Sequence, residues 1–373
     1  MKKSDVIIVG SGIIGCATAY YLTKMGISVT VIEKSEVGAG GSSRNGGGVR
    51  QSARDPREMP LALYSVRNLW PGLSDELGVD VEYTQAGNLR LGKTPAHLKR
   101  LEDIVKQGVS LGLELGMVAA EEAREICPYI SDEVIGAIFC PTDGHANPMT
   151  ATLGYYKRAR ELGAHFITGE TVQEVVLEKG FVCGVRTSKG VYASAHVLLA
   201  AAYESGMIAR AHGIYLPMQN ILIEALVTEE QPPMFAQMLG TAPADFYGHQ
   251  TKHGSFVFGG STSLEPYFLE DDTAVTRSMT APSICRAILG YFPYMAQFNI
   301  VRTWAGFKDQ MIDQIPILSR VDELPGLTMA CGFTGHGFGI APTVGMLLSE
   351  LIADKELTLS LDAFRYDRFK PKA

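Results

Sequence analysis

Three glycines and one acid near the start of the chain are spaced as in a dinucleotide-binding turn. Gly10, Gly12 and Gly15 stand in GxGxxG register, and Glu33 ends the apolar run that follows. Such glycines make a tight turn, let backbone approach a pyrophosphate and let a helix pack on a strand, while the acid accepts hydrogen bonds from a ribose hydroxyl. A carboxylate here repels a 2′-phosphate, which disfavours NADP. The further residues predicted to contact the nucleotide are Ser11, Ile13, Ile14 and Lys34.

The segments around these residues have the pattern of a strand, a helix and a second strand. Residues 5–9 form a short β-branched run typical of a buried parallel strand, and residues 13–25 have helical periodicity that stops at Gly26. Residues 28–33 predict the second strand. Because every part falls in the required order, a glycine-rich turn without a ligand is the weaker interpretation.

The next stretch distinguishes a flavin nucleotide from NAD. In a nicotinamide enzyme the second strand would lead into another helix of the sheet, whereas residues 35–70 begin as a long Gly/Ser-rich loop with Arg44 and Arg50. Such a loop offers backbone N–H groups and cations to a bulky anionic ligand. A flexible surface loop is the alternative, but its place directly after Glu33 favours FAD.

Motifs along nearly the whole length of the chain resemble those of a known family. The chain is similar to the D-amino-acid oxidase and sarcosine oxidase superfamily of FAD enzymes, and within it to β-subunits of hetero-oligomeric proline, hydroxyproline and opine dehydrogenases. The motifs, in chain order, are "VIIVGSGIIG", "GSSRNGGGVRQ", "PTDGHANP", "GAHFITGETV", "RTWAG" and "CGFTGHGFGIAPTVG". Each is a modest signal, but six in order are specific.

The resemblance implies an α/β fold with two interleaved domains. A Rossmann-like FAD-binding domain would comprise residues 1–74, 146–214 and 311–373. An antiparallel-sheet substrate domain would comprise residues 75–145 and 215–310 and cover the flavin.

The resemblance also implies which further residues hold FAD. Ser42 and Ser43 resemble residues that contact the pyrophosphate, and Val172 resembles the residue whose backbone meets the adenine. The segment from Gly335 resembles a helix N-terminus directed at the flavin, where a helix dipole stabilises the negative charge of the reduced ring. The remaining residues assigned to the cofactor are Arg44, Asn45, Gly46, Gly47, Gly48, Ala201, His336, Gly337 and Phe338.

Enzymes of this family take a hydride from the carbon beside an amine, and an amino-acid substrate brings a carboxylate that needs a cation. Arg50 is the first candidate for that cation, with a role in the loop or at a flavin phosphate as the alternative. Lys308 is a second candidate, although a surface lysine is the more ordinary interpretation. Tyr247 and His249 are predicted to line the pocket from the sheet, and His336 to serve the flavin or simply to pack.

Two departures from sarcosine oxidase indicate a different electron acceptor. Gly339 stands where that enzyme has a lysine that shares the carboxylate, and Val257 stands where it has the lysine that promotes reaction with oxygen. Without that cation superoxide is poorly stabilised, so the chain is predicted to be a dehydrogenase that passes electrons to a partner subunit or carrier.

Two alternative functions stay open beside this prediction. One is a stand-alone glycine, D-amino-acid or sarcosine-type oxidase that produces hydrogen peroxide. Another is a non-catalytic FAD-binding subunit, favoured by the unusual "AAAYESG" at residues 200–206. The resemblance also leaves open a second flavin, a noncovalent FMN, at a subunit interface. It disfavours a covalent linkage, because Pro148 stands where some related β-subunits have the linking histidine.

Composition excludes several other classes of protein. The formal net charge of −7 disfavours nucleic-acid and anionic-lipid partners. The six cysteines include no CxxC pair, so their spacing indicates neither a zinc site nor a disulfide framework. This pattern is typical of a protein in a reducing cytoplasm. The glycine-broken N-terminus does not read as a signal peptide, and no apolar run is long enough to span a membrane.

Overall fold

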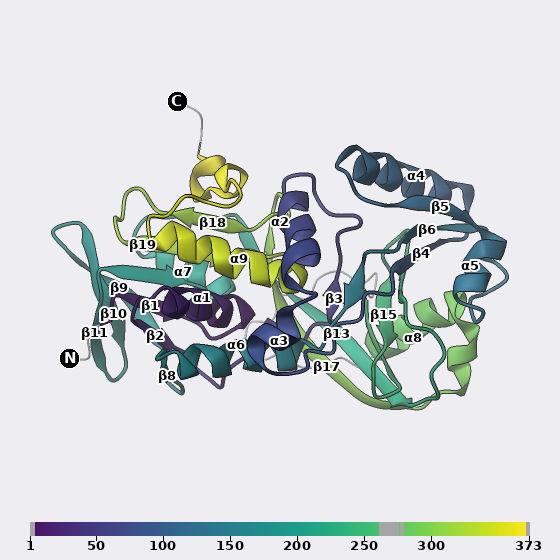
Figure 1. Ribbon diagram of the computed structural model, residues 1–373, viewed down its shortest axis with the longest axis horizontal. Coiled ribbons are helices and arrows are strands. Elements are labelled where there is room, and N and C mark those ends of the chain that lie inside the picture. The colour runs from purple at the N-terminus through teal and green to yellow at the C-terminus, as the bar shows by residue number, and fades with distance from the viewer. Residues whose placement is uncertain (1–3, 261–275, 277–279, 371–373) are drawn as a thin grey trace.

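The computed structural model describes residues 4–260, 276 and 280–370 and shows an elongated molecule with a different sheet in each half (Figure 1). The two ends of the chain lie in the same half, around a six-stranded sheet (Figure 1). Its strands run in the order β18-β19-β12-β1-β2-β8, all parallel except β18. Their bounds are β18 (Ile317–Arg320), β19 (Leu327–Cys331), β12 (His196–Leu199), β1 (Val6–Val9), β2 (Val29–Ile32) and β8 (His165–Ile167).

Both faces of this sheet are buried, as the β-branched sequence of β1 predicts. Val6 and Ile8 face one core together with the helices α1 (Ile13–Lys24), α6 (Pro148–Glu161) and α9 (Gly337–Ile352). Ile7 and Val9 face a second core on the opposite side. That core is closed by α7 (Tyr203–Arg210) and by a three-stranded sheet of β9 (Val172–Glu178), β10 (Phe181–Thr187) and β11 (Gly190–Ala193). The predicted α/β class and the strand-helix-strand start of the chain are confirmed.

The other half contains an eight-stranded sheet in the order β17-β13-β16-β15-β14-β4-β6-β5. Its neighbouring strands are antiparallel except for the parallel pair β14 and β4. The strands are β17 (Ile300–Met311), β13 (Met218–Glu230), β16 (Ser255–Gly260), β15 (Phe246–Gln250), β14 (Met238–Thr241), β4 (Asn88–Gly92), β6 (Gly136–Cys140) and β5 (Gly116–Ala119).

The register of this sheet decides which side chains look toward the first half. Phe256 and Phe258 of β16 pack on the outer face with α8 (Thr280–Tyr291). Tyr247 pairs with Gly259 and His249 with Val257, and directly opposed residues share a face. Tyr247, His249 and Val257 therefore lie together on the inner face.

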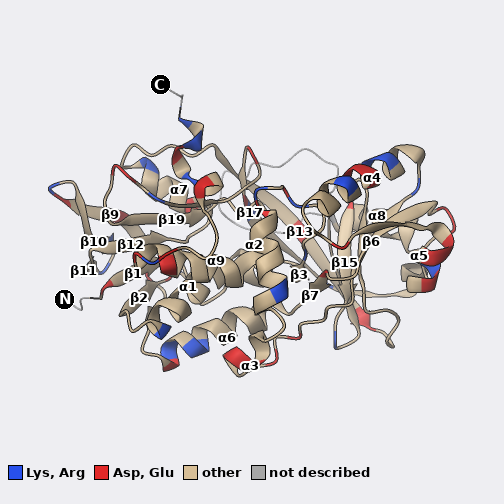
Figure 2. Ribbon diagram, turned by 45° about the horizontal axis from the view of Figure 1, so that its top comes forward, with Lys and Arg blue, Asp and Glu red and all other residues tan. Residues whose placement is uncertain are grey.

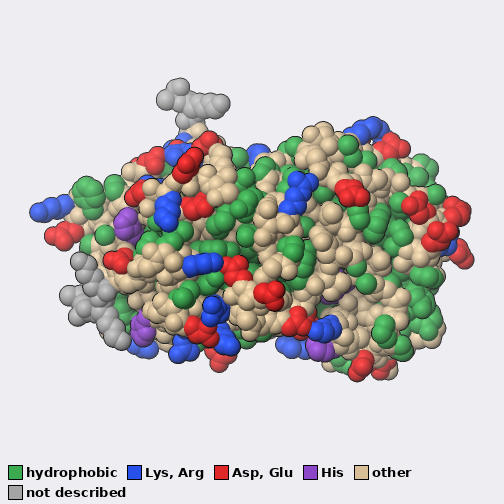
Figure 3. Space-filling view, viewed as in Figure 1, with side chains coloured by type: hydrophobic (Ala, Val, Ile, Leu, Met, Phe, Trp, Pro, Cys, Tyr) green, Lys and Arg blue, Asp and Glu red, His purple; other side chains and the backbone are tan. Residues whose placement is uncertain are grey.

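A two-stranded ribbon of β3 (Gly48–Val49) and β7 (Gly144–His145) joins the halves, followed by the short helices α2 (Met59–Tyr64) and α3 (Leu73–Leu77). Lys and Arg are interspersed with Asp and Glu over the whole molecule (Figure 2), and the face in Figure 3 shows the same mixture. In the described ranges no helix has the length and apolarity needed to cross a bilayer.

Candidate functional site

The glycine turn after β1 is shaped by close backbone contacts. Gly10 has φ +101, and a Cβ on it would lie 2.5 Å from the carbonyl oxygen of Ala200. A Cβ on Gly15 would lie 2.0 Å from the oxygen of Gly10, so α1 begins directly against the turn. Gly12 is the N-cap of α1 and has no side chain to cap it. The helix thus presents backbone N–H groups at its positive end, the arrangement that binds a pyrophosphate.

Ser42 and Glu33 converge on this helix start. The Ile13 N–H donates to Ser42 Oγ at 2.8 Å. Glu33 Oε2 accepts from the Ser11 backbone N–H at 2.8 Å and from Ser11 Oγ at 3.0 Å. The carboxylate of Glu33 is partly exposed at the carboxyl end of β2, where a ribose hydroxyl would be met.

The remaining residues assigned to the nucleotide end lie near Glu33 or the end of β12. The Glu170 N–H donates to the Glu33 carbonyl at 3.0 Å, which places Val172, two residues later, beside this end. Lys34 forms an ion pair with Glu204 at the start of α7. The Ala201 N–H donates to Ser205 Oγ at 2.8 Å.

The loop after Glu33 is fastened to the other half of the molecule through Arg44. Its guanidinium donates to the carbonyl oxygens of Ala39 at 3.1 Å and Ala305 at 2.6 Å, and Trp304 Nε1 donates to the Arg44 carbonyl at 2.9 Å. Asn45 Nδ2 donates to the Ser42 carbonyl at 3.0 Å and fixes the bend of the loop. The Arg44 side chain is therefore bound by protein carbonyls, and its own N–H donates to the Gly41 carbonyl at 3.2 Å. Arg44 thus holds the loop in place and does not offer its charge to a ligand.

A second helix N-terminus, that of α9, lies beside residues 48–50 that follow this loop. Gly335 has φ +77, His336 is the N-cap of α9, and no side chain of the N-cap residue satisfies the first helical N–H groups. Trp70 Nε1 donates to the Gly339 carbonyl at 2.8 Å and its ring lies 5.2 Å from that of Phe338. The start of α9 is thus held in place, as a preorganised positive end requires.

The inner face of the large sheet covers both the loop and the start of α9. A Cβ on Gly46 would lie 2.8 Å from Tyr247 Cε2, and a Cβ on Gly335 would lie 3.1 Å from Lys308 Cδ. Burial lowers the pKa of Lys308 and raises that of Tyr247. Within the described residues the Lys308 ammonium has no hydrogen-bond or ion-pair partner. An aromatic hydroxyl and a cation therefore face the predicted flavin-binding backbone.

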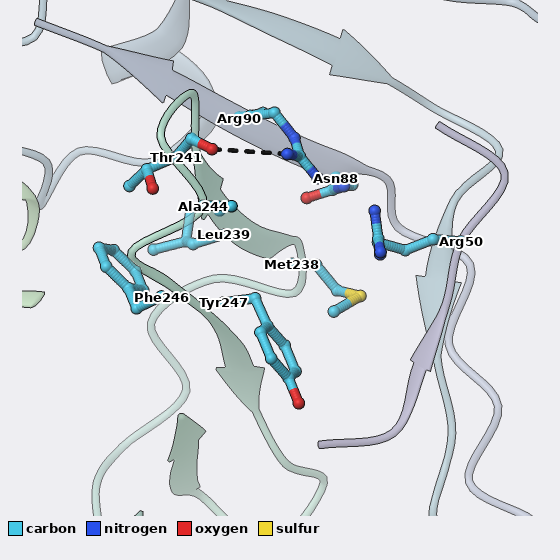
Figure 4. Close-up of a pocket in the computed structure, with 10 residues that line it drawn as sticks. Arg50, Asn88, Arg90, Met238, Leu239, Thr241, Ala244, Phe246 and Tyr247 are labelled. Carbon is cyan, nitrogen blue, oxygen red and sulfur yellow. Dashed lines mark hydrogen bonds between the residues drawn. The ribbon is translucent and has the colours of Figure 1, made fainter. Parts of the chain in front are cut away.

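Arg50 points from the end of β3 into a cavity of about 80 Å³ (Figure 4). One of its nitrogens donates to the Ser52 carbonyl at 3.1 Å. Tyr247 and Arg90 line the same cavity, while His249 is absent from its lining as far as the structure describes the chain. The structure thus brings Arg50 and Tyr247 together, with Lys308 on the same sheet face.

His249 packs against another histidine instead. Its ring stacks on that of His145 with centroids 3.8 Å apart and planes 20° apart. Burial lowers the pKa of His145 to about 4 and that of His249 well below its ordinary value. Both rings are therefore neutral at pH 7 and serve as packing between the ribbon and the sheet.

Two buried carboxylates position Arg50 and were not anticipated from the sequence. Asp143 Oδ1 accepts from the Gln51 N–H at 2.6 Å and binds the Ser52 hydroxyl through its other oxygen. Glu58 forms a 2.9 Å ion pair with Arg54, whose side chain is 2% exposed. The "RDPRE" run at 54–58 has the i, i+4 spacing of such a pair, which is the one signal in the sequence.

Arg54 connects two of the predicted site residues. Its Nε donates to the Arg50 carbonyl at 2.6 Å and its second terminal nitrogen to the His336 carbonyl at 3.0 Å. His336 Nδ1 lies 3.6 Å from Glu58. Burial alone would raise the pKa of Glu58, but Arg54 and His336 outweigh it and hold that pKa below its ordinary value.

A third buried acid, Asp309, leads to a prediction on pH dependence. Burial raises its pKa to about 6, although the Gly332 N–H donates to Oδ2 at 2.7 Å. The folded state therefore binds this proton more tightly than the unfolded state, so stability falls as pH rises from about 4 to about 6. At pH 7.5 Asp309→Asn should be more stable than the wild type by up to about 3 kcal/mol, with no advantage at pH 4.

Urea unfolding of both proteins at four pH values between 4 and 7.5 measures this difference. Asp75→Asn, an exposed acid of α3, is the matched control and should show no such trend. A constant difference between Asp309→Asn and the wild type at all pH values would contradict the prediction.

The glycine turn, the acid after β2 and a second helix N-terminus beneath a largely antiparallel sheet together define a flavin-type dinucleotide oxidoreductase. Residues 5–351 match the family model described as FAD dependent oxidoreductase, and the chain belongs to this family. The family predicted from the sequence is confirmed.

Relatives and solved structures agree with this assignment. Sarcosine oxidase subunit beta from Arthrobacter sp is 30% identical over 378 residues, which cover 99% of this chain and 92% of the relative. L-proline dehydrogenase from P. horikoshii superposes with a TM-score of 0.92 at 30% identity, covering 99% of this chain and 98% of that chain. Glycine oxidase from Geobacillus kaustophilus has a TM-score of 0.93 at 23% identity and covers 100% of both chains, a likeness that shows the fold alone.

Proposed function

We propose that the chain is an FAD-dependent dehydrogenase that oxidises the C–N bond of a small secondary amino acid and passes the electrons to a partner subunit or carrier. The observation that carries this proposal is that Arg50 and Tyr247 line one cavity beside the loop, while Lys308 lies against Gly335 at the start of α9, the two segments that suit a flavin. The proposed division into FAD-binding and substrate domains, at residues 75, 146, 215 and 311, places this cavity between the two.

The residues fit FAD by shape and by donor set. Gly10 and Gly15 stand where a Cβ would meet backbone, the start of α1 offers N–H groups, and Glu33 offers a carboxylate. Ser42, Ser43 and the backbone of residues 45–48 would hold the rest of the nucleotide together with the start of α9. When bound, FAD supplies the two-electron acceptor.

The protein's own residues then orient the amino acid. Arg50 would bind the substrate carboxylate, because a guanidinium matches a carboxylate in a bidentate geometry. The Tyr247 hydroxyl and the Lys308 ammonium approach from the sheet, and the surrounding apolar cover excludes water, which strengthens each contact. The positive end of α9 favours negative charge beside Gly335 and His336.

The identity of the electron acceptor rests on the inner face of β16. Val257 lies on that face opposite His249, so at this position the described sheet offers no cation to stabilise superoxide. The curated relatives named sarcosine oxidase subunit beta are subunits by name, which supports a partner for this chain as well. A noncovalent FMN at that interface is part of the proposal, and the FMN content of the purified complex tests it.

Anaerobic reduction followed by admission of air tests the function. The FAD-loaded protein is mixed with sarcosine, L- and D-proline, hydroxyprolines, glycine or opines while the flavin absorbance is recorded. Bleaching by a secondary amino acid with slow recovery in air is expected. Fast recovery with peroxide would instead make the protein an oxidase, and no bleaching by any amine, with or without its partner, would leave a non-catalytic subunit.

Arg50→Met should weaken amino-acid binding by about 10- to 100-fold and leave the FAD content unchanged, because a charge-assisted hydrogen bond contributes about 1.5–3 kcal/mol. The dissociation constant from stopped-flow flavin reduction measures the effect, and Arg67→Gln at the exposed surface is the control. If Arg50→Met instead loses FAD while keeping substrate affinity, the arginine binds the cofactor.

A further inference from the structure

The cavity in front of Arg50 contains a second arginine. Arg90 enters it from β4, and Asn88 lies between the two guanidinium groups (Figure 4). Met238 and Phe246 supply apolar walls beside Tyr247. At about 80 Å³ the cavity exceeds the ~10–15 Å³ that one water needs, so a carboxylate with a short methylene stem has room.

Neither guanidinium is neutralised inside the cavity. No Asp or Glu is among the described residues that line it. The nearby acids are already engaged, since Asp143 binds Gln51 and Ser52 while Glu58 binds Arg54. Because a buried charge is costly unless it is paired, two arginines sharing one cavity favour an anion between or beside them.

The protein satisfies Arg90 only weakly. One of its terminal nitrogens lies 3.5 Å from the Thr241 carbonyl, at the outer limit of a hydrogen bond, and its buried Nε has no partner within the described residues. Burial and the charge of Arg50 lower the pKa of Arg90 to about 9, which still leaves it charged at pH 7. A guanidinium held in this way retains several N–H donors for a ligand.

We infer that Arg90 binds a second carboxylate, so that the substrate is an amino acid with two acidic groups. This inference rests on the proposed function, in which Arg50 binds the first carboxylate. A substrate with a single carboxylate would leave one buried cation uncompensated, whereas a dicarboxylate matches both. The second acid would sit on a short stem, because the cavity ends at Thr241 and Ala244.

A binding experiment with redox-inert ligands tests this inference without turnover. The FAD-loaded protein is titrated with glutarate and with its monoamide, and the flavin spectrum reports binding. Glutarate is expected to bind at least about tenfold more tightly, because only it carries the second charge. In Arg90→Gln that ratio should fall to about one, and in Arg90→Lys part of it should return.

Arg100→Gln is the matched control. Arg100 is exposed on α4 (Pro95–Ser110), yet its charge is close enough to contribute to the lowered pKa of Arg90. The variant therefore removes the same charge without emptying the cavity, and it should keep the ratio of the wild type. Equal binding of glutarate and its monoamide to the wild type, or an unchanged ratio in Arg90→Gln, overturns the inference.

A matched substrate pair separates this inference from the proposed function. Iminodiacetate and sarcosine share the secondary amine and differ in the second carboxylate. Faster flavin reduction by iminodiacetate at low concentration is expected, with the advantage lost in Arg90→Gln. If sarcosine is oxidised and iminodiacetate has no advantage, the inference fails and the function stands. If neither reduces the flavin while the preference for glutarate persists, the function fails and the two-arginine site stands.

Discussion

Gly15→Ala is expected to weaken FAD binding by at least about 100-fold, so that the variant purifies without its yellow colour. The added Cβ would lie 2.0 Å from the Gly10 oxygen and 3.3 Å from Ile8 Cγ2. Neither neighbour is the end of a flexible side chain, so α1 must move away from β1. That shift displaces the N–H groups at the helix start, and the overpacking costs about 1–3 kcal/mol of stability in addition.

The ratio of flavin to protein absorbance, and FAD titration of the flavin-free chain, measure this loss. Gly116→Ala in β5 is the matched control, because a Cβ there meets nothing within 4 Å. It should keep both the colour and the stability of the wild type. Full FAD occupancy in Gly15→Ala would mean that the nucleotide does not depend on the start of α1.

Local signals were enough to predict the nucleotide end of the site. The strand, the glycine turn, α1 and β2 follow one another within 34 residues, so their order, periodicity and positive-φ glycine could be read directly. The start of α9 could also be predicted, since the strand β19, two glycines and a helical run are contiguous. These elements need no knowledge of how distant segments meet.

The side chains around the substrate cavity depend on contacts between strands that are far apart in the sequence, and local sequence patterns do not contain this information. Tyr247 and His249 share a face of β15 through its register with β16, but only the packing of the ribbon strand β7 against that face places His145 on His249. Arg90 is an ordinary polar residue of a strand until the parallel pairing of β4 with β14 brings Thr241 beside it. A one-residue change in either register would redirect these side chains.

Contacts between distant segments are also the reason that the sequence predicts a role for Arg50 but none for Arg54. Its i, i+4 partner Glu58 could be recognised, but its bond to the His336 carbonyl joins residues 282 apart in the chain. Arg44 behaves alike, since it fastens the loop to Ala305 rather than offering its charge to a ligand. Arginines close together in sequence thus take a positioning role or a binding role according to contacts made across the fold.

Arg54→Met is expected to destabilise the protein by about 3–5 kcal/mol, because it leaves the Glu58 carboxylate buried without its partner. Glu58→Met should have an effect of similar size for the converse reason. The double variant, Arg54→Met with Glu58→Met, should recover much of the lost stability, since an apolar pair replaces both charges. Urea unfolding of the four proteins measures these differences, and Lys99→Met is the control. Lys99 is 64% exposed in its i, i+4 pair with Asp103 and should cost less than about 0.5 kcal/mol.

Flavin reduction distinguishes a positioning role for Arg54 from a purely structural one. In every variant that lacks Arg54, the carbonyls of Arg50 and His336 lose the donors that fix them. The double variant should therefore stay slow, with the maximal rate of reduction lowered at least about tenfold even at saturating amino acid. If the double variant regains both its stability and its rate of flavin reduction, the role of the buried pair is purely structural. A double variant that regains stability but not rate would show that Arg54 aligns Arg50, the proposed partner of the substrate carboxylate, with the start of α9.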